Sequence, residues 1–431
     1  MTPVQPVRGT QSLLGEDADR LAAVVSAFDR VRRLYGFKRV EVPTIEHTAV
    51  FARTIGETTD VVSKEMYSFE DRGGEGITLR PEFTAGICRA YLSEGWQQYA
   101  PLKLATHGSA FRYERPQKGR FREFHQLDAE IIGAGEPQAD IEILAFADQL
   151  LRELGIEGAI LQLNTLGDPE TRAAWRDALL EHFRAKAADL SEDSQARLER
   201  NPLRILDSKA HQDWPIVDSA PPIDEFLTSE AAEFFAQVTE GLSAAGVQWE
   251  RAPRLVRGLD YYRHTAFEFV TDRLGSQGTV LAGGRYDGLI ESLGGPHTPA
   301  VGWAAGIERL AMMIDTPYPE RPEFVFVPIG AQAEAECTRL ITLFRRRGAY
   351  CDMAYRGNVK KRMQKADAAG ASYVVIVGDD ELVNNEVTIR SLKSGEQVKR
   401  KLEGDLLNDR IGRNAFLAFA LNGLDGHKAP E

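Results

Sequence analysis

The chain has 431 residues, 43% of them hydrophobic, and a formal net charge of −12 at pH 7. This length predicts two or three domains with ordinary globular cores and excludes a small disulfide-stapled scaffold. Cys88, Cys337 and Cys351 lie far apart without a CxxC pair, so neither a disulfide framework nor a thiolate zinc site is indicated. Without a signal-peptide run or an apolar window approaching about 20 residues, we expect a cytoplasmic protein with no membrane segment.

The charge is distributed unevenly. Residues 323–431 carry 17 Lys and Arg against 15 Asp and Glu, whereas residues 1–322 carry 35 against 49. Nine basic residues and one acid, Asp352, fall within residues 339–365; the basic ones are Arg339, Arg345, Arg346, Arg347, Arg356, Lys360, Lys361, Arg362 and Lys365. Such a patch could contact RNA phosphates, and the alternative is two solvated helix faces.

The first predicted element is a helix over residues 17–35, in which Leu21, Val24, Phe28 and Val31 recur at helical spacing before Gly36. A strand running into Pro43 follows. Residues 72–76 form a predicted hairpin turn, and LRPE then precedes a helix. Pro81 suits the helix beginning, where Thr84 can cap the helix or present its hydroxyl.

Residues 111–130, FRYERPQKGRFREFHQLDAE, predict a hairpin with a basic tip, because Pro116 and Gly119 supply turn chemistry between two strand-like arms. In the returning arm, His125, Leu127, Ala129 and Ile131 alternate onto a face that resembles core. The opposite face carries Arg122, Phe124, Gln126, Asp128 and Glu130. Burying those polar groups is costly unless they bind each other or a polar ligand, and a half-solvated strand is the alternative.

An amphipathic helix over residues 139–155 and a strand at ILQLNTLGD come next, and residues 168–246 then become helix-rich and acidic. This change in composition predicts an inserted helical module. In residues 254–270, Gly258 permits a tight backbone after Arg257, and a strand-like run follows Tyr261 and Tyr262. Arg257 can neutralise a phosphate or carboxylate, and a tyrosine hydroxyl can bind an imidazole nitrogen; an ordinary surface turn is the alternative.

Residues 276–295 predict a glycine-flanked strand, turn and helix, without the spacing of a known phosphate-binding loop. PAVGWAAGIERLAMMI predicts a strand that feeds a helix carrying Arg309. Residues 315–323 are rich in proline and charge and indicate a linker. Beyond them, strands alternate with amphipathic helices, which predicts a small α/β domain with a mixed sheet.

The order FRYE, basic loop, then R.F.Q...E in residues 111–130 resembles motif 2 of class II aminoacyl-tRNA synthetases, and in detail it is similar to histidyl-tRNA synthetases. The helix and strand before Pro43 look like motif 1, and PAVGWAAGIERLAMMI looks like motif 3. LRPE.TA, RGLDYY and AGGRYDGL resemble the family's histidine-associated segments, and ERNPLRILDSK resembles its insertion. The C-terminal part is similar to the anticodon-binding domain of class IIa synthetases.

This resemblance implies an α+β catalytic domain over residues 1–318, with an antiparallel sheet flanked by helices and an insertion at about 168–246. A linker at 319–323 and an anticodon-binding α/β domain at 324–431 would follow. The implied activity is the ligation of L-histidine to tRNA(His) through a histidyl-adenylate made from ATP, by a homodimer whose interface includes motif 1. ATP would bring Mg²⁺, held by its phosphates and by carboxylates such as Glu123, rather than by a protein-only metal site.

The resemblance also implies roles for individual residues. The implied catalytic residues are Arg112, Arg257 and Arg309. Histidine would be bound by Glu82, Thr84, Arg112, Gln126, Glu130, Arg257, Tyr261, Tyr262 and Tyr286. ATP would be bound by Arg112, Glu114, Arg120, Glu123 and Arg309, and the tRNA acceptor end by Arg115, Gln117 and Lys118.

Two other functions stay open at this stage. The family commonly has glycine where Phe83 stands, and this departure favours a regulatory paralogue of histidine biosynthesis that keeps the fold without aminoacylation. The intact RGLDYY and the C-terminal domain favour the ligase. An RNA-binding accessory protein would explain the basic patch but not the arginine and carboxylate positions. His125, His264 and His297 lack metal-ligand spacing, so we expect structural roles for them.

Overall fold

The computed structural model describes residues 3–55, 59, 61–199, 201–256, 262–275, 278–315, 317, 321–403 and 413–425. Contacts divide the chain into two compact units, Met1–Pro317 and Tyr318–Glu431, each with its own sheet and core. None of the helices in the described segments combines the length and the apolarity needed to cross a membrane.

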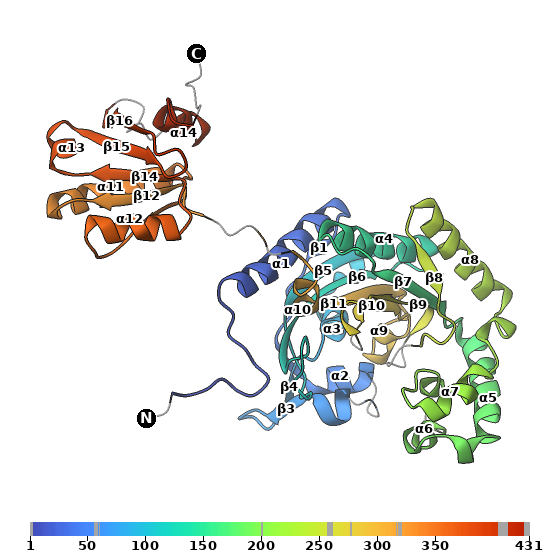
Figure 1. Cartoon of the computed structure of the whole chain (residues 1–431). Helices are drawn as coiled ribbons and strands as arrows, with labels where there is room; N and C mark the ends of the chain where they lie inside the picture. The colour runs from blue at the N-terminus through green and yellow to red at the C-terminus, as the bar shows by residue number, and fades with distance from the viewer. Residues whose placement is uncertain are drawn as a thin grey trace. The chain divides into compact units, whose positions relative to one another are not determined.

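The first unit is built on an eight-stranded sheet with the strand order β1-β5-β6-β11-β10-β9-β7-β8 (Figure 1). Its strands are β1 (Lys38–Arg39), β5 (Leu102–Phe111), β6 (Glu123–Ile132), β7 (Ile160–Thr165), β8 (Trp249–Arg251), β9 (Arg263–Val270), β10 (Thr279–Arg285) and β11 (Ala300–Gly306). Neighbouring strands pair antiparallel, except that β1 is parallel to β5 and β7 to β8. The α+β class with a largely antiparallel sheet is confirmed.

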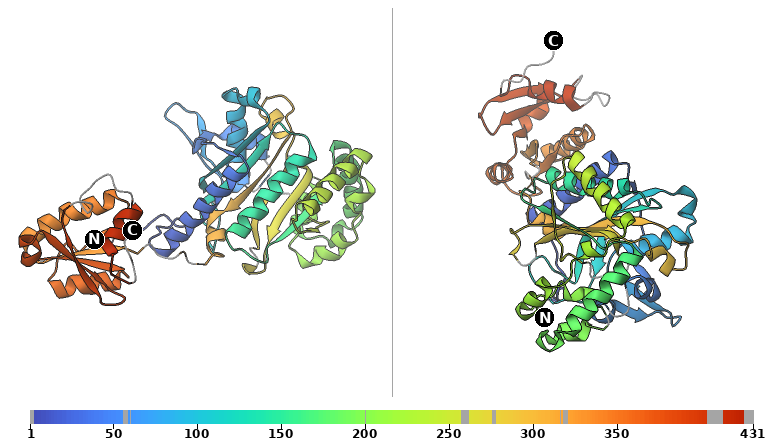
Figure 2. Two further views of the ribbon diagram at one scale, coloured as in Figure 1. Left: turned by 90° about the horizontal axis from the view of Figure 1, so that it is seen from above. Right: turned by 90° about the vertical axis from the view of Figure 1, so that its right-hand side faces the viewer.

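One face of this sheet is covered by α1 (Glu16–Leu34), α4 (Pro137–Glu153) and α8 (Ser229–Ala244), and Figure 2 shows α1 and α4 lying across it. Both predicted helices, over residues 17–35 and 139–155, are confirmed. Phe28 of α1 stacks on Phe146 of α4 at 5.8 Å and meets the edge of Trp303 from β11 at 6.0 Å. The apolar side of α1 therefore packs inside its own chain, and the homodimer with motif 1 in its interface stays a prediction.

The other face carries α3 (Thr84–Ser93), α9 (Leu289–Ser292) and most of the region predicted to be a helical insertion. That region contains α5 (Pro169–Arg184), η3 (Ala187–Asp189), α6 (Glu192–Arg197), η4 (Pro202–Ile205), η5 (His211–Asp213), α7 (Trp214–Asp218) and η6 (Ile223–Glu225). Asp168 caps α5 by accepting from Thr171 N at 2.7 Å. The last predicted helix of this region, α8, packs instead on the α4 side, with Val238 and Leu242 in that core.

A three-stranded sheet, β2 (Ile45–His47), β4 (Gly76–Leu79) and β3 (Tyr67–Glu70), lies beside α2 (Thr48–Ile55) and η1 (Val61–Glu65). The predicted turn at 72–76 is confirmed, because Glu70 pairs with Gly76. The chain then runs through α3 and η2 (Trp96–Tyr99) into β5. The predicted strand before Pro43 is shorter than expected, since β1 ends at Arg39.

The second unit has a mixed five-stranded sheet in the order β13-β12-β14-β15-β16, in which β12 is parallel to both neighbours and the remaining pairs are antiparallel. Its elements are β12 (Phe324–Pro328), α11 (Ala331–Arg346), β13 (Cys351–Met353), α12 (Val359–Ala368), β14 (Tyr373–Val377), α13 (Asp379–Val383), β15 (Glu386–Ser391), β16 (Gln397–Lys401) and α14 (Arg413–Leu421). Helices α11 and α14 cover one face and α12 the other. The predicted α/β domain is confirmed.

Candidate active site

The predicted hairpin is formed by β5 and β6, which pair over their full lengths from Leu102 with Ile132 to Phe111 with Glu123. Between them, Gln117 and Arg120 form an isolated bridge at the tip, where Arg115, Gln117 and Lys118 are exposed. Both faces of β6 are buried beyond His125. The alternative of a half-solvated strand is therefore wrong, because β6 lies between β5 and β11 with layers on both sides.

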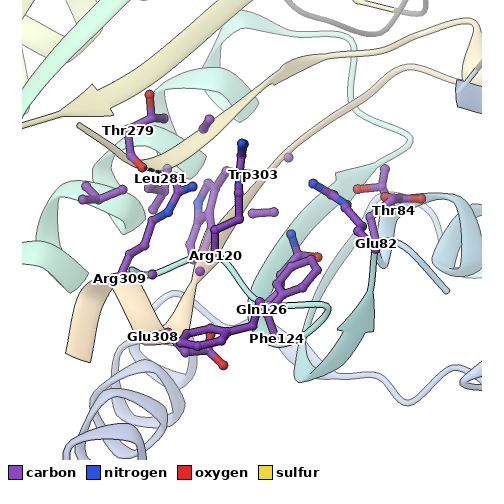
Figure 3. Close-up of a pocket in the computed structure, with 18 of the residues that line it drawn as sticks. Glu82, Thr84, Arg120, Phe124, Gln126, Thr279, Leu281, Trp303, Glu308 and Arg309 are labelled. Atoms are coloured by element: carbon purple, nitrogen blue, oxygen red, sulfur yellow. Dashed lines mark hydrogen bonds between the residues drawn. The ribbon is translucent and has the colours of Figure 1, made fainter. Parts of the chain in front are cut away.

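One cavity of about 250 Å³ opens over β6, β10, β11 and the short helix α10 (Ile307–Ala311) (Figure 3). Ten of the predicted site residues line it: Glu82, Thr84, Arg112, Glu114, Arg120, Gln126, Glu130, Tyr262, Tyr286 and Arg309. Glu123 does not; it lines a neighbouring pocket with Gln11, Leu13, His125 and Glu308. Arg257 and Tyr261 lie outside the described residues.

The acidic end of the cavity is centred on Glu130, which is 1% exposed. Thr84 Oγ1 donates to Glu130 Oε1 at 2.7 Å, and the Tyr286 hydroxyl donates to Glu130 Oε2. Burial raises the pKa of Glu130 to about 8, against the lowering effect of these two donors. Glu130 does not pair with an arginine across the sheet, since its oxygens accept from Thr84 and Tyr286 and its cross-strand neighbours are Leu104 and Gly302.

Space for Glu130 depends on Gly302, its partner on β11. A Cβ added at Gly302 would lie 1.5 Å from Glu130 Oε2, so any larger residue would expel the carboxylate. Glu82 adds a second buried carboxylate at this end; its Oε1 accepts from Ala85 N at 3.0 Å at the start of α3. Burial raises the pKa of Glu82 as well. Thr84 therefore presents its hydroxyl to Glu130 instead of capping the helix.

The basic end of the cavity holds three guanidinium groups. Arg112 Nε donates to Pro81 O at 3.0 Å, and its guanidinium lies 5.3 Å from the centre of the Phe124 ring. Arg309 Nη1 donates to Thr279 O at 2.8 Å, and Arg120 pairs with Glu114 at 2.5 Å. Burial, followed by the nearby charges of Arg120 and Arg112, lowers the pKa of Arg309. Cations held this close together favour an anionic ligand between them.

Phe83 does not narrow the cavity. It is 1% exposed, is absent from the cavity lining and packs beneath the Arg80 guanidinium, which lies 4.1 Å from the centre of its ring. Arg80 itself donates to Val42 O and Ser109 O, both at 2.8 Å. The bulky side chain at position 83 thus fills space between α3 and the sheet, and Glu82 and Thr84 reach the cavity on either side of it.

Sequence reasoning missed Glu308, which lines the cavity directly before Arg309. Its carboxylate accepts from His125 N at 3.0 Å and pairs with His125 Nδ1 at 2.8 Å, joining α10 to β6. The hydrogen bond to Glu308 raises the pKa of His125. The period-2 pattern places His125 on the face opposite Gln126, but no sequence signal pairs it with a residue 183 positions away.

The other two histidines differ from each other. His264 is half-buried with φ 44°, and its ring centre lies 4.5 Å from that of Phe234 with the two rings tilted. Burial lowers the pKa of His264. His297 pairs at the surface with Glu291 at 3.5 Å. Among the described residues, no group of three or more His, Cys, Asp or Glu side chains could hold a metal ion.

A largely antiparallel sheet with arginines from the loop after β5 and from the helix after β11, facing carboxylates on β6, defines the catalytic domain of a class II aminoacyl-tRNA synthetase. The family model described as histidyl-tRNA synthetase matches residues 9–310, and the anticodon binding domain matches residues 323–404.

Individual relatives agree with the family models. The chain is 64% identical to a histidine–tRNA ligase of Novosphingobium aromaticivorans over 86% of its own length and 90% of the relative's. It is 54% identical to a histidine–tRNA ligase of Gluconacetobacter diazotrophicus over 94% and 97%. The crystal structure of apo S. aureus histidyl-tRNA synthetase superposes with a TM-score of 0.79 at 33% identity, covering 93% of this chain and 98% of that one. The chain belongs to the histidyl-tRNA synthetase family.

Proposed function

We propose that the cavity binds histidine at its acidic end and ATP at its basic end, and that it joins them as histidyl-adenylate before transfer to tRNA(His). The overall activity is that of a histidine–tRNA ligase, as family membership and the 64% identical relative indicate. One observation carries the site: buried carboxylates and clustered guanidinium groups line a single cavity. An amino acid with a cationic amine and a nucleotide with anionic phosphates match those two ends.

At the acidic end, Glu130 would accept a hydrogen bond from an imidazole N–H, with its carboxylate held in place by Thr84 and Tyr286. Glu82 and Gln126 line the cavity beside it and are suited to the α-ammonium group. Tyr262, 7% exposed, lines the cavity and would close this end. Tyr261 is assigned to the same pocket on the RGLDYY resemblance alone.

At the basic end, Arg112 and Arg309 would hold the α-phosphate and γ-phosphate, and the Arg120–Glu114 pair would border the nucleotide. Arg257 is assigned here by resemblance as a bridge between the histidine carboxylate and the α-phosphate. The histidine carboxylate attacks the α-phosphate in line and pyrophosphate leaves, so no protein nucleophile is needed. The arginines neutralise the charge that develops, which is worth several kcal/mol in a partly desolvated site.

Mg²⁺ would accompany ATP and neutralise phosphate charge. The described residues do not form a metal site of their own, and Glu123, the carboxylate proposed from the sequence, lines the neighbouring pocket. Of the carboxylates in the cavity lining, Glu114 belongs to the basic end through its pairing with Arg120. The metal would therefore be held chiefly by the phosphates.

For tRNA, the exposed tip residues Arg115, Gln117 and Lys118 are suited to the acceptor end, and the second unit is suited to the anticodon. The basic patch of that unit is smaller than its sequence suggests, because Arg347 and Arg362 are 6% and 5% exposed. Lys360, Lys361 and Lys365 on α12 remain available for phosphates, as all three are exposed. A cytoplasmic homodimer is proposed on the family resemblance.

The test is charging of tRNA(His) transcripts with labelled histidine by the purified protein. A ligase forms acid-precipitable histidyl-tRNA in an ATP-dependent reaction. A regulatory paralogue would form no histidyl-tRNA, although it would still bind histidine. The sequence argument for the paralogue rested on Phe83. Because Phe83 lies outside the cavity lining, that argument is weakened.

A further inference from the structure

Asp128 is a buried carboxylate for which neither the motifs nor the family resemblance supplied a role. It lies on β6 between Gln126 and Glu130, opposite Thr106 on β5 and Ala304 on β11. The alternation of a strand puts Asp128 on the same sheet face as its two flanking residues, both of which line the cavity. It is 0% exposed and is not itself part of the lining, so it lies directly beneath the acidic end.

The polar atoms around Asp128 lack partners. Neither Asp128 oxygen has a hydrogen bond of its own, because the Thr84 hydroxyl beside it donates to Glu130. Thr106 Oγ1, directly across the sheet, is also without a partner. Gln126 Oε1 is also buried without a partner, although the residue itself faces the cavity at 8% exposure. Buried acceptors are almost always satisfied in native proteins, so this set points to a ligand that brings hydrogen-bond donors and positive charge.

The titratable groups that face Asp128 are mostly acidic. They are Glu130 on the same strand, Glu82 and Arg80 from the segment before α3, Cys88 on α3, and Tyr286 after β10. Arg80 is the one cation of this set, and two of its nitrogens donate to backbone carbonyls. Thr106 and Ala304, the cross-strand neighbours, carry no charge.

An ionised carboxylate in this position would be fully buried beside the carboxyl groups of Glu130 and Glu82, an arrangement that strongly disfavours the charged form. Burial, then the charges of Glu130 and Glu82, hold the pKa of Asp128 well above its usual range. The environment of the free protein therefore favours the protonated form of Asp128. A cation within a few ångströms reverses the balance, because an opposite charge typically lowers a carboxyl pKa by about 1 to 3.

We propose that Asp128 holds a proton in the free enzyme and releases it to solvent when the α-ammonium group of histidine enters the cavity, so that one positive charge replaces another. The inference rests on the proposed assignment of the acidic end to histidine. Asp128 then acts as a positioning residue: once ionised, it adds its field to those of Glu82 and Glu130 around the ammonium group. Histidine binding is thereby linked to pH, and affinity rises as the solution becomes more alkaline.

The test is isothermal titration calorimetry of histidine binding to the full-length protein from about pH 7 to 8.5, repeated in buffers of different ionisation enthalpy. For wild type we expect net proton release and a rise in affinity approaching tenfold per pH unit where a full proton leaves. Asp128→Asn, isosteric but unable to ionise, should release fewer protons and show a shallower rise in affinity than wild type; Glu130, with a pKa of about 8, contributes in both proteins. The ionisation of the histidine ligand is the same with every protein variant, so it cancels when the variants are compared.

Thr106→Val is the matched control, because it removes the unpartnered hydroxyl across the strand without removing a titratable group. It should keep the wild-type proton release. Proton release by Asp128→Asn equal to that of wild type would overturn the proposal, as would an equal loss in Thr106→Val, which would indicate a packing effect.

Two ligand analogues test the proposal on the wild-type protein alone, should Asp128→Asn fail to fold. Histidinol keeps the ammonium group and should release more protons on binding than imidazolepropionate, which lacks that group and meets only Glu130 through its imidazole. Equal release with both ligands contradicts the exchange of a proton for an ammonium group. Absence of histidine binding by wild type would instead contradict the proposed function, so the two failures are distinguishable.

Discussion

Glu130→Ala should raise the histidine KM steeply and leave the ATP KM nearly unchanged. A charge-assisted hydrogen bond to an imidazole is worth roughly 1.5 to 3 kcal/mol, which corresponds to about 10- to 150-fold in KM. The substitution also leaves the Thr84 and Tyr286 hydroxyls without their acceptor in a buried site, so the effect should lie in the upper part of that range.

The assay is steady-state ATP–pyrophosphate exchange with histidine and ATP varied in turn. Glu142→Ala is the control, because it removes a carboxylate that pairs with Lys103 at 2.7 Å outside the cavity lining. It should leave both KM values within about twofold, as expected for a half-exposed ion pair of small energy. If Glu130→Ala lowers the melting temperature without a selective rise in the histidine KM, then Glu130 is structural and the assignment of the acidic end is wrong.

Four further predictions address other parts of the chain. Arg309→Ala should slow exchange by about a hundredfold, or near 3 kcal/mol, and an unchanged rate would remove Arg309 from the site. Deleting residues 320–431 should leave exchange measurable while tRNA charging collapses; full charging by a folded truncation would refute the anticodon assignment. The pKa of His125 is raised in the folded protein, so its pairing with Glu308 stabilises the fold fully below about pH 6.5 and progressively less as the pH rises through the folded pKa. The melting temperature of His125→Gln should therefore lie furthest below that of wild type at low pH, and the difference should shrink as the pH rises. Light scattering at micromolar concentration should give a dimer mass, and a monomer mass would count against the homodimer.

Local patterns predicted the elements of the site correctly where one physical rule dominates. The hairpin of β5 and β6 follows from strand alternation interrupted by Pro116 and Gly119, and α1 follows from apolar spacing ended at Gly36. The same alternation could not say that the polar face of β6 would be buried, because that depends on α3 and its preceding segment packing above it.

The remaining errors have a common cause, namely contacts between segments far apart in the chain. The effect of Phe83 on the cavity could be judged only from the structure, in which the Arg80 guanidinium covers its ring. Arg347 and Arg362 were counted as part of a basic surface, but the fold buries both side chains. The joining of His125 to Glu308 and the burial of Asp128 beside Glu130 and Glu82 likewise require the tertiary structure. The sequence placed ten of the predicted site residues in segments that line one cavity, and tertiary packing decides which of their neighbours are buried with them.

The most direct measurement is ATP–pyrophosphate exchange by the purified protein with each of the common amino acids in turn, in the presence of magnesium and without tRNA. The cavity described above predicts exchange that depends on histidine and is lower by at least about a hundredfold with every other amino acid, because an unpaired buried carboxylate rejects side chains that lack an N–H donor. Exchange that proceeds equally with several amino acids, or fails with histidine while the protein is folded, would contradict the account.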